Sequence, residues 1–333
     1  MCLASFALDV SSRFPFVLAG NRDEFMARPS ARLGWWEGPA LPPILGGRDL
    51  QGGGTWMGLT AHGRLAFVTN YRDPAREDKT APTRGDLVTA WLKGDAPMDR
   101  LWPRLAMSGY NGFNLVALDF AQGECFWGSN RARYPQRLER GLYGISNGHL
   151  NSPWPKVDQL KARTKAALAS AETVDELAMR LFEALADPTV APDEELPHTG
   201  VPIEWERILS PAFVRTPDGS YGTRSSTLII TERVNKRLVT HVLERTYTAG
   251  AKMALLRRVT LKNWPPRHTT PLDQLAKLDQ TLPPAELRHD ERFESSDVQE
   301  EDDHALEGVG APLPARKTRA RSLIKSSRPR RGE

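Results

Sequence analysis

The chain has 333 residues, of which 45 are lysine or arginine, 41 are aspartate or glutamate and two are cysteine. Two cysteines supply neither a disulfide framework nor a metal-ligand set, and the sequence has neither a signal-peptide pattern nor an unbroken run of about 18 apolar residues. The composition therefore favours a soluble, cytoplasmic protein without a membrane span or a metal. Residues 313–333 hold eight basic residues and one acidic residue, and without them the formal net charge falls from +4 to −3, so we expect no nucleic-acid partner for the rest.

The first predicted element is a β-hairpin. Residues 2–9 are apolar and mostly small, 11–15 carry turn-forming residues, and 16–19 are apolar again. A hairpin of this length returns Arg22 and Asp23 to the end of the first strand at which the chain starts.

Cys2 is a candidate nucleophile because of its place in the chain. If Met1 is removed, Cys2 carries both a thiol and a free α-amine. Their ordinary pKa values, about 8.5 and 7.7–8.0, let the amine take the thiol proton near neutral pH. Asp23 is then a candidate acceptor for the amine, and Arg22 a candidate cation beside the thiolate. The alternative is that Cys2 is an ordinary residue.

A segment rich in glycine and proline follows, at 28–54. It matches neither phosphate-binding glycine motif, so we expect a series of turns that leads into a strand. Residues 55–59 and 65–69 are then predicted to form the two strands of a hairpin, and the second strand ends at Asn70.

The remaining predicted elements are strands paired as hairpins, with helices grouped between them. The first is a helix from about Gly85, with Thr83 as its cap, followed by strands 113–120 and 124–127 and a short strand closed by 144–147. Two helices come next, at 156–168 and 174–185, and Ser170 or Thr173 could cap the second. Strands 228–230 and 238–243 are the last predicted elements. Hairpins disfavour a doubly wound parallel sheet. The pattern is typical of an α+β protein with helices layered on sheets.

The composition changes near residue 265. Residues 290–307 are dominated by acids and 312–333 by bases, with few apolar residues in either. Such segments bury too little surface to offset the entropy of ordering. We therefore expect a domain over 1–264 and a C-terminal extension over 265–333, largely disordered, as a solvated charged tail.

Five short sequence words, in order, resemble those of a known family. They are 21–24 (NRDE), 53–58, 68–72, 146–147 followed by 152–154, and 221–227. Together they resemble the NRDE family, which is the transport and Golgi organisation protein 2 family, over about residues 1–260. That family in turn resembles the N-terminal-nucleophile hydrolases of the choloylglycine hydrolase and penicillin V acylase branch.

The resemblance implies a fold and a set of site residues. The fold is a four-layer αββα sandwich, and the nucleophile is Cys2 with its own α-amine as base. Asp23 matches the aspartate that holds the amine, Asn70 and Asn147 match two amides near the reacting carbonyl, and Arg224 matches a late arginine that organises the site. Amide donors of this kind stabilise an oxyanion by about 2.7–4 kcal/mol each. From the residues alone, turn chemistry is the alternative for both asparagines.

One departure from the pattern concerns the arginine. In the hydrolase branch an arginine stands three residues before the aspartate, whereas this chain has Gly20 there and Arg22 next to Asp23. Neighbours on a strand point to opposite faces, so Arg22 and Asp23 are not both expected to face Cys2.

The function implied by the resemblance is hydrolysis of a linear amide through a thioester at Cys2, without a cofactor and with a small-molecule amide or apolar acyl ligand as partner. The alternative is a non-catalytic intracellular protein that handles haem or a lipid or acyl-CoA ligand on the same scaffold. Haem would then be the cofactor, but His149 has no second ligand at a metal spacing. An interaction module working through the basic tail is the third and weakest hypothesis.

Overall fold

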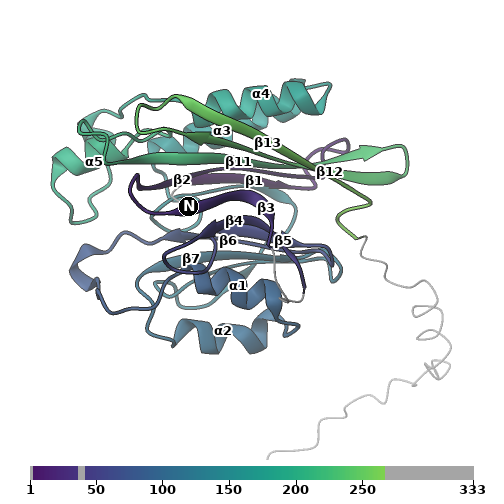
Figure 1. Cartoon of the computed structure of the whole chain (residues 1–333), viewed down its shortest axis with the longest axis horizontal. Coiled ribbons are helices and arrows are strands. Elements are labelled where there is room, and N and C mark those ends of the chain that lie inside the picture. The colour runs from purple at the N-terminus through teal and green to yellow at the C-terminus, as the bar shows by residue number, and fades with distance from the viewer. Residues whose placement is uncertain (1–2, 37–41, 267–333) are drawn as a thin grey trace, which may run out of the picture. The chain divides into compact units, whose positions relative to one another are not determined.

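The computed structural model describes residues 3–36 and 42–266. Two antiparallel sheets lie face to face, and helices cover both outer surfaces (Figure 1). Helices α3 (Pro155–Ser170) and α4 (Val174–Leu185) form one outer layer, and α1 (Gly85–Lys93) and α2 (Met98–Ala106) form the other. The four-layer αββα sandwich predicted above is therefore confirmed.

The six-stranded sheet contains the predicted N-terminal hairpin. Its strand order is β10 (Gly141–Ile145), β1 (Leu3–Leu8), β2 (Phe16–Phe25), β11 (Tyr221–Val234), β12 (Arg237–Tyr247) and β13 (Met253–Lys262). In the hairpin, Leu3 pairs with Asn21 and Leu8 with Phe16. Strand β2 continues past the start of β1 and pairs there with β11.

The seven-stranded sheet contains two more predicted hairpins. Its order is β3 (Ser30–Trp35), β4 (Ile44–Asp49), β5 (Met57–Thr60), β6 (Arg64–Asn70), β7 (Phe113–Asp119), β8 (Glu124–Ser129) and β9 (Gln136–Arg137). Strands β5 and β6 pair as expected, as do β7 and β8. Asn70 is the last residue of β6.

The prediction of turns over 28–54 was wrong, because β3 and β4 lie there. Glycines in β4 are needed by packing. A Cβ atom on Gly46 would lie 2.6 Å from the carbonyl oxygen of Met57, and one on Gly47 would lie 2.3 Å from the ring of Trp56. Glycine inside a strand marks such close approach. These glycines broke the apolar alternation from which strands are recognised.

The helix caps agree with the sequence at one helix and differ at another. The hydroxyl of Thr173 accepts a hydrogen bond from Glu176 N–H (3.1 Å) and caps α4, as predicted. Helix α1 instead begins after Arg84 without a side-chain cap, so the prediction of Thr83 was wrong. Its first turn lies against Gly54, where a Cβ atom would meet the backbone of Gly85 at 2.5 Å. A tertiary contact sets this helix start.

The hydrophobic core has three parts that match the layers. Phe6, Leu18, Phe67, Val116 and Cys125 belong to the part between the two sheets. A second part, with Val157, Leu181 and Leu228, lies between the six-stranded sheet and α3 and α4. A third part, with Trp91, Leu101 and Phe113, lies under α1 and α2.

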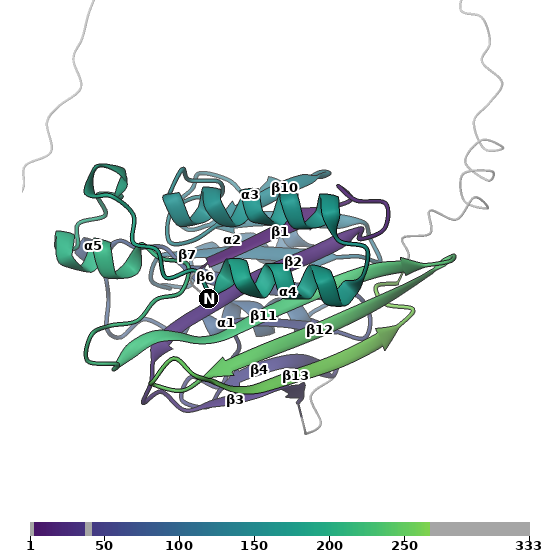
Figure 2. The ribbon, with the colours of Figure 1, turned by 90° about the horizontal axis from the view of Figure 1, so that it is seen from above.

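Helix α5 (Ile203–Leu209) lies apart from these layers. Figure 2 shows α3 and α4 side by side across the six-stranded sheet, with α5 beyond one end of the strands. Short 3₁₀ turns at Pro74–Arg76 and Asp193–Glu195 complete the described elements. None of the helices in the described ranges is long and apolar enough to cross a membrane. The extension predicted from residue 265 onward lies, after residue 266, outside the described residues.

Candidate active site

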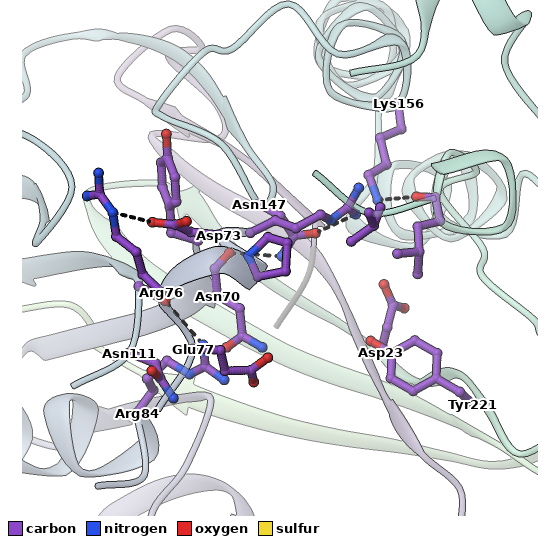
Figure 3. Close-up of a pocket in the computed structure, with 16 residues that line it drawn as sticks. Asp23, Asn70, Asp73, Arg76, Glu77, Arg84, Asn111, Asn147, Lys156 and Tyr221 are labelled. Atoms are coloured by element: carbon purple, nitrogen blue, oxygen red, sulfur yellow. Dashed lines mark hydrogen bonds and ion pairs between the residues drawn. The ribbon is translucent and has the colours of Figure 1, made fainter. Parts of the chain in front are cut away.

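Two adjoining cavities of about 200 and 550 Å³ open at the end of the sandwich where β2, β6 and β11 supply residues. We call them the inner and the outer cavity. Figure 3 shows how side chains from these separate elements surround the inner one. Both are lined by Asp23, Asn70, Glu77, Arg84, Asn111 and Tyr221. The inner cavity is also lined by Asn147, and the outer one by Arg22.

Asp23 is held by β11. Its backbone pairs with Thr223, and the Thr223 hydroxyl donates a hydrogen bond of 2.7 Å to Asp23 Oδ1. The same hydroxyl accepts from Val214 N–H at 2.9 Å, so its orientation is determined from both sides. Asp23 is buried and lines both cavities. The structure thus presents this carboxylate in one fixed rotamer to the cleft.

Arg22 points to the opposite face of β2, as the alternation of a strand requires. Leu18, Gly20 and Arg22 alternate onto the same face of β2, and Leu18 belongs to the core between the sheets. The Arg22 guanidinium lies 4.3 Å from the ring centroid of Trp56 and 3.6 Å from Glu24 Oε2. Arg22 lines the outer cavity but not the inner one.

The asparagine of the NRDE word has a structural role. Asn21 Nδ2 donates to the carbonyl oxygens of Leu185 (2.8 Å) and Ala212 (2.7 Å), and Asn21 Oδ1 accepts from the Ser226 hydroxyl (2.6 Å). Leu185 is the last residue of α4. Asn21 therefore joins the helix layer to the strand that carries Asp23.

The outer cavity has a charged lining that includes an ion pair between the turn after β2 and the last residue of β4. Arg28 lies 2.7 Å from Asp49 Oδ2 and 3.7 Å from Glu24 Oε2. Burial alone would raise the pKa of Asp49, but the hydrogen bonds from Arg28 and from the N–H of Gly52 and Gln51 outweigh it, so that the pKa is lowered. This carboxylate is ionised near neutral pH.

Asn70 and Asn147 meet at the inner cavity. Asn147 Nδ2 donates to the backbone carbonyl of Asn70 at 2.9 Å, although 77 residues separate them. Asn147 Oδ1 accepts from the Ser146 hydroxyl (3.3 Å) and from Arg72 Nη2 (3.4 Å). The side-chain amide of Asn70 has no hydrogen-bond partner among the residues that the structure describes, and it lines both cavities. Both asparagines line the inner cavity, and the second N–H of the Asn147 amide has no acceptor among the described residues.

Arg224 lies beside the cleft rather than in its lining. It stands at an irregularity in the pairing of β11 with β2, and its Nη1 donates to the carbonyl oxygens of Phe25 (2.8 Å) and Arg28 (3.0 Å). It thereby braces the turn after β2. Cys2 lies outside the described residues, which begin at Leu3.

Sequence reasoning assigned no role to three charged residues here. Lys156, near the start of α3, is 4 % exposed, donates from Nζ to the Leu209 carbonyl (2.7 Å) and lines the inner cavity. Arg72, which lines the inner cavity and contacts Asn147, forms an ion pair with Glu206. Arg72 ends the word at 68–72, which was a signal that went unused, whereas nothing in the sequence links Lys156 or Glu206 to the cleft.

His149 makes aromatic contacts. Its Nε2 lies 3.2 Å from the hydroxyl of Tyr71, and its ring meets that of Trp127 edge to face at 6.0 Å. In the described ranges no group of three or more histidine, cysteine, aspartate or glutamate residues is placed to hold a metal ion.

The architecture and the cleft define a class: an αββα sandwich whose N-terminal hairpin leads into a polar cleft that is lined by Asp23, Asn70 and Asn147. Residues 1–249 match the family described as Transport and Golgi organisation 2. The chain belongs to this family, as the five sequence words predicted. The Transport and Golgi organization protein 2 homolog of Bos taurus is 32 % identical over 254 residues, which cover 70 % of this chain and 89 % of that protein.

Solved structures with a similar arrangement have little sequence identity to this chain. An N-acylethanolamine-hydrolyzing acid amidase ortholog of Caenorhabditis elegans has a TM-score of 0.41 at 8 % identity, covering 69 % of this chain and 92 % of that one. A mutant conjugated bile acid hydrolase of Clostridium perfringens has a TM-score of 0.42 at 9 % identity, covering 78 % and 92 %.

Proposed function

We propose that the protein is an N-terminal cysteine amidohydrolase, which cleaves a linear amide through a thioester at Cys2. One observation carries the proposal: Asp23, Asn70 and Asn147, from three separate segments, line one cavity. Leu3 pairs with Asn21, two residues before Asp23. Position 2 is one peptide unit, about 3.8 Å between Cα atoms, from Leu3. The covalent chain therefore supports a Cys2 near this cavity.

The proposed reaction needs Met1 to be removed. The α-amine of Cys2 takes the thiol proton, and the thiolate attacks the carbonyl carbon of the amide. The C–N bond then breaks, the departing amine takes the proton from the α-ammonium group, and a thioester remains. Water, deprotonated by the same α-amine, attacks the thioester, and the C–S bond breaks. The acid is released, and the thiolate can take the proton back from the α-ammonium group. Asp23 is proposed to accept a hydrogen bond from the α-amine and to orient it.

Asn70 and Asn147 are proposed to stabilise the oxyanion. Donors that are fixed before the reaction stabilise developing charge without a reorganisation cost. Asn147 suits this role because one of its two N–H groups is held by the Asn70 carbonyl, so the direction of the other is determined. The polar and charged lining of the outer cavity favours an amide that carries polar groups over a wholly apolar acyl chain.

The test begins with the intact mass of the purified full-length chain, which should lack one methionine. Iodoacetamide should then alkylate Cys2 much faster than Cys125. Cys125 is buried in the core between the sheets, and burial raises the pKa of its thiol, so little thiolate forms there. Equal alkylation rates, located by peptide mass, contradict the proposal.

Cys2→Ala is the control that separates catalysis from binding alone. In the proposed enzyme it abolishes turnover of linear amides and acyl esters. If the wild type shows no turnover, and both proteins bind haem or an acyl thioester equally, the chain is a carrier and the hydrolase proposal is wrong.

A further inference from the structure

Beside Asn147, in the wall of the inner cavity, Arg72 forms an ion pair with Glu206. Arg72 Nη1 and Glu206 Oε2 are 2.5 Å apart, and the two side chains are 11 % and 2 % exposed. Arg72 follows β6, whereas Glu206 lies in α5, 134 residues further along the chain. A pair buried to this degree has a high desolvation cost, so its contribution to stability is small or negative unless its remaining hydrogen bonds are satisfied.

The hydrogen bonds of Glu206 fix the carboxylate completely. Its second oxygen, Oε1, accepts from both the N–H (3.0 Å) and the hydroxyl (2.6 Å) of Thr199. The guanidinium of Arg72 also lies over the ring of Trp154, 5.2 Å from the centroid. Arg72 is therefore held in one orientation by a carboxylate on one side and an aromatic face on another.

Arg72 contacts Asn147 in two ways. Its backbone N–H donates to the Asn147 carbonyl at 2.8 Å, and its Nη2 donates to Asn147 Oδ1 at 3.4 Å. A guanidinium has only donors, so the oxygen of the Asn147 amide must face Arg72 and its NH₂ group must face the Asn70 carbonyl. The charge of Arg72 also polarises the amide, which makes Asn147 N–H a better donor.

We propose that Arg72, fixed by Glu206, is a positioning residue that orients and polarises the Asn147 amide as an oxyanion donor. This inference rests on the proposed function, because it assigns Asn147 that role. It makes a distinct prediction: Arg72 affects reactions that pass through an oxyanion and does not affect other reactions of the same thiol.

Two probes of Cys2 separate these cases. p-Nitrophenyl acetate acylates the thiolate through a tetrahedral oxyanion, with loss of p-nitrophenolate as the C–O bond breaks. Iodoacetamide alkylates it by displacing iodide, and no oxyanion forms. The ratio of the acylation rate to the alkylation rate at Cys2, located by peptide mass on the full-length chain without Met1, isolates the oxyanion contribution.

Arg72→Lys keeps a cation beside Glu206 but lacks the fork that reaches Asn147 as well. We expect its rate ratio to fall on the order of tenfold, with alkylation unchanged, against about 10²-fold for Asn147→Ala. Arg64→Lys is the matched control. Arg64 is a similarly buried arginine paired with Asp119 and stacked on Trp91, but it lines neither cavity, so the ratio should not change.

An unchanged ratio in Arg72→Lys, or an equal fall in both rates, overturns the inference, because the arginine would then be structural only. If Arg72→Lys does not fold, Glu206→Gln replaces it, and its ratio must fall. A wild type that is alkylated at Cys2 but never acylated contradicts the proposed function, and the positioning role falls with it. Acylation of the wild type with no change in either variant contradicts the positioning role alone.

Discussion

A half-buried arginine lies at the start of strand β6 and another lies just past its end, and the two have different roles. At its first residue, the Arg64 guanidinium lies over Trp91 (4.2 Å) and 3.1 Å from Asp119. It also donates to four backbone carbonyls at the end of α1 and just beyond, those of Trp91, Gly94, Asp95 and Ala96. Two residues past the other end, Arg72 likewise pairs with a carboxylate and a tryptophan, but its third partner is the side chain of Asn147.

The difference lies in what the arginine holds. Arg64 satisfies carbonyl groups that a helix end leaves without partners, and cations are favoured there by the helix dipole, so its contacts serve the fold. Arg72 instead contacts side chains, and both Arg72 and its partner Asn147 line the inner cavity. Similar burial and similar partners therefore do not tell a stabilising arginine from a positioning one. The remaining acceptors do: they are backbone carbonyls for Arg64 and the side chain of Asn147 for Arg72.

The largest effect is expected from breaking the pair at the cleft end. Glu206→Leu leaves Arg72 buried without a counter-ion and should lower the free energy of unfolding by about 3–5 kcal/mol. The double variant Arg72→Met with Glu206→Leu should recover most of that loss in urea unfolding while its acylation of Cys2 stays low. A double variant that regains acylation as well as stability would show that the pair serves the fold, as Arg64 does.

A smaller effect is expected at the other end of β6. Arg64→Met removes the charge but leaves Asp119, whose Oδ1 still accepts from the N–H of Ala121 and Gln122. We expect a loss of about 2 kcal/mol in the free energy of unfolding, since hydrogen bonds to charged groups contribute about 1.5–3 kcal/mol. Both rates at Cys2 should equal those of the wild type under conditions in which the variant is folded. A selective loss of acylation would erase the contrast between the two ends.

The smallest effect concerns acid stability at the outer cavity. The folded state lowers the pKa of Asp49, so its contribution to stability is complete above the unfolded value of about 3.9 and is lost as the pH falls through the lower folded value. Asp49→Asn should therefore flatten the decline of stability below about pH 4. Arg28→Gln removes the main cause of the lowered pKa and should flatten the curve in the same way. Acid curves parallel to the wild type in both variants would contradict this account.

Elements with a local signal were predictable from the sequence. The two apolar runs at 2–9 and 16–19, with turn-forming residues between them, gave the hairpin, and the Thr173 cap gave the start of α4. Elements that depend on distant partners were not predictable. Helix α2 carried a local signal that went unused, since Met98, Leu101, Trp102 and Leu105 are apolar at helical spacing around Pro103. Strand β13 has no such signal, because most of its residues are exposed. Backbone pairing with β12 forms β13 instead.

The candidate site divides in the same way. The resemblance of short words to a family singled out Asp23, Asn70 and Asn147, which line the inner cavity together, whereas Arg22 lines only the outer one. Which of Arg22 and Asp23 faces Cys2 stays a prediction. The partner of Arg72 lies 134 residues away on α5, and one sequence contains no signal for such a pair. The roles of these residues in catalysis stay predictions.

The placement of Cys125 between the sheets allows its thiol to report how often the two sheets separate. Its sulfur is shielded by both layers, with 6 % of the residue exposed. A thiol reagent reaches it at an appreciable rate only when the two sheets separate, because the closed state offers neither access nor thiolate. The slow phase of thiol labelling therefore measures how often the two sheets separate, in native buffer and without an introduced cysteine.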